Sequence, residues 1–150
     1  MKRIYLAADH AGVELKNILK EHLRSRGNRH IDMGGHDPHA FDSYPHITDE
    51  LVHALQLDPS PESRGVVICG TGIGTSIRAN RHPGIRAAVV HNVQTARACR
   101  QHNNANILCL GARVITPDTA KTLLDRFLAT PFEDGRHGPR VAALDMDTVQ

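Results

Sequence analysis

The sequence has few aromatic residues, little net charge and no long apolar run. Aromatic residues make up 3% of the 150 residues and tryptophan is absent, which disfavours a nucleic-acid surface built on base stacking. The formal net charge is +2 and the basic residues are scattered, so charge gives no reason to expect a nucleic-acid partner. No apolar run approaches the roughly 20 residues that cross a bilayer, so we expect no membrane partner.

Cysteine is also scarce. Cys69, Cys99 and Cys109 form no Cys-x-x-Cys pair, and their odd number disfavours a disulfide framework. The first residues reach Asp9 too early for a secretory signal peptide, so a cytoplasmic protein is expected. Histidine is frequent, with 11 copies, but its spacing yields no coherent set of four ligands. We therefore expect neither a required metal nor another cofactor.

Short apolar runs alternate with amphipathic helical patterns along the whole chain. Predicted strands cover residues 3–8, 30–33, 66–69, 85–90 and 107–110. Helical patterns follow Gly12, start near Ile47, cover residues 75–81 and 93–102, and start at Pro117. Residues 34–45 are expected to form a loop, and a last helix is expected from Arg140. The alternation predicts βαβ units and a parallel sheet with helices on both faces, in one domain spanning residues 1–150.

A glycine-rich segment, Cys69-Gly70-Thr71-Gly72-Ile73-Gly74, follows the third predicted strand directly. Ligands of parallel sheets bind beyond the carboxyl ends of strands, and backbone N–H groups at a helix start attract anions and favour a thiolate. A dinucleotide fingerprint fails, because Thr75 stands where glycine or alanine is needed and no ribose-binding acid follows the next strand. A small phosphate or an enediolate oxygen fits the loop better. A tight turn without a ligand, with Cys69 as a structural residue, remains the alternative.

Polar residues occupy other ends of the predicted elements. Asp9 and His10 follow the first strand, where they either serve a ligand or, in the case of Asp9, cap a helix. His102 and Asn103 end a predicted helix, where a histidine is also favoured simply by the helix dipole.

Arginines form a third group of candidates. Arg113 follows the last predicted strand, and Arg136 and Arg140 lie four residues apart. Such a pair can fork around a phosphate, or it can be ordinary solvated surface charge.

Taken together, these residues resemble the type B ribose-5-phosphate isomerase family, which also includes allose-6-phosphate and galactose-6-phosphate isomerases. The resemblance covers nearly the whole chain and is carried by residues 8–12, 42–45, 69–74, 79–81, 100–103, 106–108, 111–113 and 135–137. It implies a Rossmann-like three-layer α/β sandwich with a five-stranded parallel sheet. It also implies a homodimer or tetramer whose active sites are shared between subunits, and isomerisation of a phosphorylated aldose without a metal.

The resemblance further implies roles for single residues. Cys69 matches the catalytic base, His102 the residue that assists opening of the furanose ring, and Thr71 one that helps ring opening or orients the substrate. Thr75 stands where some members carry a glutamate base, which indicates the cysteine type. The implied substrate-binding residues are Asp9, His10, Tyr44, Gly70, Gly72, Ile73, Gly74, Asn103, Arg113, Arg136 and Arg140, some of the phosphate-side ones from the partner subunit.

The expected reaction is the interconversion of D-ribose 5-phosphate and D-ribulose 5-phosphate through an enediolate, which N–H groups of the 70–74 loop would stabilise. Three alternatives remain open: an isomerase of allose 6-phosphate or galactose 6-phosphate, an isomerase of rare free sugars, and a non-catalytic module that binds sugar phosphates. The tail at residues 141–150 either packs on the partner subunit or is mobile.

Overall fold

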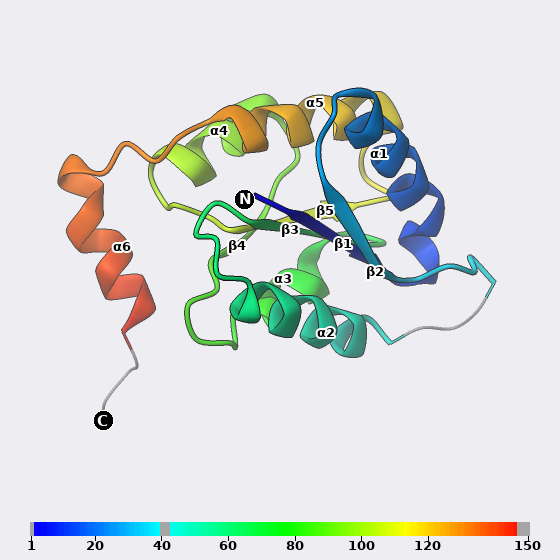
Figure 1. Ribbon diagram of the computed structural model, residues 1–150, viewed down its shortest axis with the longest axis horizontal. Coiled ribbons are helices and arrows are strands. Elements are labelled where there is room, and N and C mark those ends of the chain that lie inside the picture. Colours follow the sequence, from blue (N-terminus) through cyan, green and yellow to red (C-terminus); the bar gives the residue numbers. More distant parts are fainter. Residues whose placement is uncertain (1, 40–42, 147–150) are drawn as a thin grey trace.

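The computed structural model describes residues 2–39 and 43–146 (Figure 1). Five strands form one parallel sheet in the order β2-β1-β3-β5-β4. They are β1 (Ile4–Ala8), β2 (His30–Gly34), β3 (Arg64–Cys69), β4 (Ala87–Val89) and β5 (Ile107–Gly111). The five-stranded parallel sheet is therefore confirmed.

Helices cover both faces of this sheet (Figure 1). One face packs against α1 (Val13–Ser25), α4 (Val93–Gln101) and α5 (Pro117–Ala129), and the other against α2 (Tyr44–Leu57) and α3 (Ile73–Ala79). Two short 3-10 turns (His10–Gly12 and Gly135–His137) and α6 (Gly138–Asp145) complete the fold, and α6 stands beside the sandwich (Figure 1). The predicted three layers are confirmed. None of the helices in the described ranges has the length and hydropathy of a membrane span.

The burial of each element follows from its residues. All residues of β1 and β5 and all but the first of β3 are buried, as expected for central strands covered on two faces, whereas the edge strands β2 and β4 are half-buried. In α1 the buried stripe includes Leu15, Leu19 and Leu23, which recur at helical spacing. The predicted start of α5 is confirmed, because the Thr116 hydroxyl accepts the Thr119 N–H at 3.2 Å.

Some boundaries differ from the predictions. Helix α2 begins at Tyr44, inside the expected loop 34–45, because Pro45 is tolerated in a first helical turn. Helix α3 begins at Ile73 rather than at residue 75, and α6 at Gly138 rather than at Arg140. Strand β4 is shorter than the predicted 85–90. Predictions that fall on Asp42 and on residues 147–150 lie outside the described residues.

The strand order of the sheet indicates where a ligand would bind. Strands β1 and β3 are neighbours, but α1 leads from β1 to β2 on one side, and α3 leads from β3 toward β4 on the other. Such a reversal opens a crevice beyond the carboxyl ends of the two strands. Asp9 and Cys69 lie at that point, so we call it the switch-point edge of the sheet.

Candidate active site

Cys69 ends β3 at the switch-point edge and is 5% exposed. Its sulfur accepts the Gly72 N–H at 3.1 Å and lies 3.7 Å from the Thr75 hydroxyl oxygen. The same hydroxyl donates to the Gly72 carbonyl at 3.0 Å, which holds the first turn of α3 against the sulfur. The Cys69 sulfur is thus held in place by a backbone N–H and a side-chain hydroxyl at the end of β3.

The glycines of this loop permit the geometry. Gly72 has φ 80°, a left-handed conformation that an L side chain adopts only with strain. A Cβ on Gly111 would lie 2.7 Å from the backbone of Thr71, so β5 and the loop approach each other closely. Two N–H groups of the loop are used internally, since Gly72 donates to sulfur and Ile73 donates to the Thr71 hydroxyl at 3.2 Å. The predicted anion cradle therefore has fewer N–H groups to offer than the sequence suggested.

Asp9 and His10 lie beside this loop at the end of β1. The Asp9 N–H donates to the Ile68 carbonyl at 3.1 Å, and its carboxylate accepts the Ala11 N–H at 3.0 Å. The helix-capping alternative for Asp9 is thus confirmed. A cap and a sugar contact are compatible, because a carboxylate has two oxygens and about four acceptor sites.

Arg113 and Tyr44 frame the two ends of the glycine loop. A Cβ on Gly70 would lie 2.9 Å from a guanidinium nitrogen of Arg113, and a Cβ on Gly74 would lie 2.7 Å from the Tyr44 ring. Both side chains are exposed. Of the predicted site residues, the switch-point edge thus gathers Asp9, His10, Tyr44, Cys69, Gly70, Thr71, Gly72, Ile73, Gly74 and Arg113.

The remaining predicted residues lie at the opposite edge of the sheet. Helix α4 runs antiparallel to the strands, so His102 and Asn103, at its end, lie near the amino ends of β3 and β5. Asn106, three residues further on, accepts the Gly65 N–H at 3.0 Å at the start of β3. Because β3 has six residues, the two edges are about 16 Å apart. One chain does not bring His102 to Cys69.

Basic side chains gather around His102 at this second edge. The His102 and His137 rings stack with centroids 4.5 Å apart, and Arg136 and Arg140 are near enough to act electrostatically on His137. Burial, and then the charges of His102 and Arg136, lower the pKa of His137. Glu133 is the acid among them, and its carboxylate and the two imidazoles have donor atoms within 4.8 Å of one another. We call these five residues the basic cluster.

Arg100 lies two residues before His102 and was not singled out as a functional residue by the sequence. It is 4% exposed, donates to the Thr130 and Ala105 carbonyls at 3.2 and 2.6 Å and to the Asn104 side chain at 2.9 Å, and lies over the Phe127 ring. Burial lowers its pKa to about 10, so it stays charged at neutral pH. Its place on the buried face of α4, next to Cys99, is the signal that could have marked it.

Cys99 and Cys109 contrast with Cys69. Burial raises the pKa of Cys99 to about 11 and that of Cys109 to about 12, so both remain protonated at neutral pH. Their expected place in the core is confirmed. A cysteine in an apolar core is inert, whereas the Cys69 sulfur faces an N–H donor.

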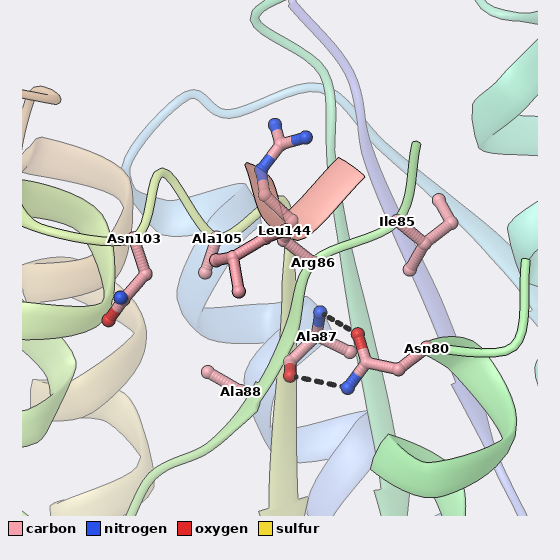
Figure 2. Close-up of a pocket in the computed structure, with 8 residues that line it drawn as sticks. All are labelled: Asn80, Ile85, Arg86, Ala87, Ala88, Asn103, Ala105 and Leu144. Carbon is pink, nitrogen blue, oxygen red and sulfur yellow. Dashed lines mark hydrogen bonds between the residues drawn. The ribbon is translucent and has the colours of Figure 1, made fainter. Parts of the chain in front are cut away.

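A cavity of about 370 Å³ opens beside Asn103 (Figure 2). Ile85 and Leu144 give it apolar walls. The side-chain amide of Asn80 donates to the Ala87 carbonyl at 2.9 Å and accepts the Ala87 N–H at 2.7 Å, which covers the polar edge of β4 at this residue (Figure 2). The cavity therefore suits apolar side chains better than an added strand.

The fold and the site define a class: doubly wound parallel α/β proteins with a thiol beside a glycine loop at the switch point. Comparison with known proteins narrows this class. A family model described as Ribose/Galactose Isomerase matches residues 4–144. The chain belongs to the ribose/galactose isomerase family.

Similar proteins cover the whole fold. The chain is 40% identical over 144 residues to ribose-5-phosphate isomerase B of Escherichia coli strain K12, covering 96% of this chain and 95% of that one. The structure of ribose 5-phosphate isomerase B from Anaplasma phagocytophilum is similar at 46% identity and a TM-score of 0.88, covering 96% and 97% of the two chains. Ribose-5-phosphate isomerase B from Mycoplasma genitalium, solved with bound ribulose-5-phosphate, is similar at 37% identity and a TM-score of 0.91, covering 95% and 93%.

Proposed function

We propose that this chain is an aldose–ketose isomerase that interconverts D-ribose 5-phosphate and D-ribulose 5-phosphate. The observation that carries the proposal is the buried Cys69 thiol, held against the Gly72 N–H at the switch point of a sheet that matches a relative solved with the ketose product. The family description also names galactose, so hexose phosphates are the substrates to test beside the pentose.

The first chemical step is opening of the furanose ring. A proton leaves the O1 hydroxyl while another is delivered to the ring oxygen, and the bond from C1 to the ring oxygen breaks to give the aldehyde. We assign assistance of this step to His102, because an imidazole exchanges protons near neutral pH. Thr71, exposed on the glycine loop, orients the sugar.

The second step moves hydrogen between carbons. The Cys69 thiolate removes the proton from C2, and the electron pair forms the C1–C2 double bond of an enediolate. The proton returns to C1, while the hydroxyl proton of O2 is transferred to O1, so that C2 becomes the carbonyl. N–H groups of residues 70–74 stabilise the enediolate oxygen, and one such donor is typically worth about 3 kcal/mol.

Different residues bind the sugar and the phosphate of the substrate. Asp9, Tyr44 and Asn103 contact the sugar, and His10, Arg113, Arg136 and Arg140 neutralise the phosphate. Phosphate binding far from C1 and C2 turns binding energy into orientation of the reacting carbons.

We further propose that the complete site forms between two copies of the chain. The switch-point edge and the basic cluster are about 16 Å apart along the strands, which is too far for one ribose phosphate to touch both in the same chain. A twofold arrangement would place Cys69 of one subunit against His102 of the partner subunit, and the reverse, giving two identical sites.

Exposed apolar side chains support this association. Ile73 and Ile77 lie one helical turn apart on α3, beside Cys69, and are 53% and 61% exposed. Leu144 and Met146, on and just after α6, are also exposed, and α6 stands beside the sandwich (Figure 1). We infer that α6 packs on the partner subunit, and that the chain acts as one domain in a homodimer or a pair of dimers. Its three free cysteines, all buried, suit a reducing cytoplasm.

The first test is turnover of ribose 5-phosphate in the presence of EDTA, with allose 6-phosphate and galactose 6-phosphate alongside. Rapid, EDTA-resistant formation of ribulose 5-phosphate is expected. Turnover of only a hexose phosphate would change the substrate, and turnover of none of the three by the folded protein would overturn the proposal.

The shared site is tested by mixing two inactive variants. Cys69→Ala and His102→Ala are unfolded together in equal amounts and refolded, so that half of random dimers are mixed. Each mixed dimer has one intact site, so roughly a quarter of wild-type turnover is expected. Each variant refolded alone is the control. If the mixture stays as inactive as its parts while sedimentation shows dimers, the site lies within one chain.

A further inference from the structure

The basic cluster contains one acid whose role the isomerase reaction does not explain. Glu133 lies among two histidines and two arginines, where phosphate binding would favour only positive or neutral groups. Its carboxylate oxygen is 3.9 Å from the His137 ring nitrogen Nε2, which is too long for a hydrogen bond. The Glu133 N–H donates to the Gln101 carbonyl at 3.1 Å, so its backbone is fixed against the end of α4.

The donor atoms around Glu133 are of the kinds that bind zinc, and they lie near one another. His102, Glu133 and His137 each offer one ligand atom, and all three atoms lie within 4.8 Å of one another. The ligand atoms of a tetrahedral zinc ion lie about 3.4 Å apart, given bonds of about 2.0–2.1 Å. The Glu133 side chain is exposed, the His102 ring is exposed but stacks on His137, and the His137 ring is buried. Closing the set around one ion requires the His102 ring to turn out of its stack on His137 and the Glu133 carboxylate to move inward.

The nitrogen of His137 that faces the cluster carries a lone pair. The Arg136 Nε–H donates to His137 Nε2 at 3.5 Å, so that nitrogen acts as an acceptor. A metal ion would replace this weak hydrogen bond, and the Arg136 side chain, which is exposed, can move away. Two imidazoles and one carboxylate favour zinc, cobalt or nickel over magnesium or calcium, which prefer oxygen ligands.

We propose that His102, Glu133 and His137 form a binding site for a zinc-class divalent cation, and that the bound ion inhibits the enzyme. Zinc with these three ligands keeps a fourth position for water. Its bond to His102 removes the imidazole from proton transfer. The binding stands by itself, whereas the inhibition rests on the proposed function, because it requires His102 to assist ring opening.

Metal binding is tested first without reference to activity. Protein freed of metal with EDTA is titrated with Zn²⁺ by calorimetry and with Co²⁺ by visible absorption, which reports tetrahedral coordination. One ion per chain is expected. Glu133→Gln should weaken binding at least about tenfold, and Glu62→Gln, a change of another exposed acid, should leave it unchanged.

Cys69 is the other side chain that could bind Zn²⁺. A second variant, Cys69→Ala, distinguishes binding at Cys69 from binding at the proposed site. The Cys69→Ala protein should still bind one Zn²⁺ with unchanged affinity, and its cobalt spectrum should show no sulfur charge-transfer band. Loss of zinc binding in Cys69→Ala, or full binding in Glu133→Gln, would overturn the proposed site. Because this assay needs no turnover, it decides the metal site even where no sugar phosphate is isomerised.

Inhibition is measured on the full chain with ribose 5-phosphate. Zn²⁺ should inhibit the wild type reversibly, EDTA should restore turnover, and Mg²⁺ and Ca²⁺ should have no effect. Measured against its own turnover without zinc, Glu133→Gln should need at least about tenfold more Zn²⁺ for the same fractional inhibition. Equal zinc sensitivity of wild type and Glu133→Gln would contradict inhibition through this site.

Discussion

The two edges of the sheet differ in how their candidate site residues are buried and held. At the switch-point edge, Cys69 and Asp9 are buried, and each accepts a hydrogen bond from a backbone N–H. At the other edge, His102 and Arg136 are exposed, and Arg100 fixes the backbone beneath them. One edge is pre-organised within a single chain, whereas the other presents positive charge to solvent.

The roles proposed for the two edges account for this difference. Removal of a proton from carbon needs a base and an oxyanion site that are held rigidly and kept from water, because their hydrogen bonds gain strength in a low dielectric. Capture of a phosphate needs mobile, exposed cations that attract an anion from a distance. An α/β chain separates the two, since strands and the helices that follow them end at opposite edges. The proposed association of two chains would bring the two edges together.

The largest expected effect is at the buried edge. Cys69→Ala should lower isomerase turnover by about 10²- to 10⁴-fold, the usual contribution of a general base, with little change in stability. Turnover of ribose 5-phosphate and thermal unfolding are the two measurements. Cys99→Ala, a change of another buried thiol, is the control and should keep its turnover. Full activity of folded Cys69→Ala would show that Cys69 is not the base and that the switch-point edge does not carry the proton transfer.

The support of the exposed edge is tested by Arg100→Met. The variant leaves the Ala105 and Thr130 carbonyls without their guanidinium donor, which should cost about 2 kcal/mol of unfolding free energy. Because Arg100 also shapes the loop that carries His102, KM for ribose 5-phosphate should rise severalfold. Arg100→Lys keeps the charge without the planar fork and should be intermediate. A variant with wild-type KM and wild-type denaturant midpoint would show that this edge needs no such support.

Alanine variants of two glycines distinguish the effect of backbone strain on stability from an effect on catalysis. Gly72 and Gly84 have nearly equal φ values, 80° and 75°, so each alanine variant should lose about 1–2 kcal/mol of stability through backbone strain. Gly72→Ala should lose more, because its Cβ would lie 3.1 Å from the Leu110 backbone, whereas a Cβ on Gly84 would meet nothing within 4 Å. Only Gly72→Ala should also lower turnover, by roughly tenfold, since it moves the N–H that points at the Cys69 sulfur. Denaturant unfolding and steady-state kinetics distinguish the two effects. Equal turnover in both variants would mean that this N–H does not matter for activity.

The smallest effect concerns a link between α2 and α3. The hydrogen bond from Arg78 lowers the pKa of Asp49 to about 2, helped by His82 and opposed by burial. Since the folded pKa lies below the unfolded value near 3.9, this link stabilises the fold above about pH 4, and the contribution is lost as the pH falls toward 2. Asp49→Asn should therefore lower Tm slightly at pH 7 and flatten its decline in acid, with turnover at pH 7 unchanged. An acid profile identical to the wild type would contradict the assignment.

Much of the fold was predictable because the signals are local. The strands ending at Ala8 and Cys69 are apolar runs of the length that a doubly covered strand needs, and the start of α5 is marked by Thr116 and Pro117. The start of α2 was not, because Tyr44 and Pro45 carry the composition of a loop, whereas the buried stripe that marks the helix begins only at Ile47. Edge strand β4 was predicted too long, because the Ile85 N–H donates to the His82 carbonyl in a turn and the Arg86 N–H donates to the Asn106 side chain, so neither N–H joins the sheet.

The sequence by itself determined the chemistry of the site: a thiol, a glycine loop and basic residues at recognisable intervals. It also determined where in its element each residue lies: Cys69 ends a strand, and His102 ends a helix. Only the tertiary structure decided that these ends lie on opposite edges, that Arg100 is buried beneath the second edge, and that Glu133 stands among cations. The reason is physical: spacing along a chain fixes what each segment forms, but distances between segments depend on how the sheet and helices pack.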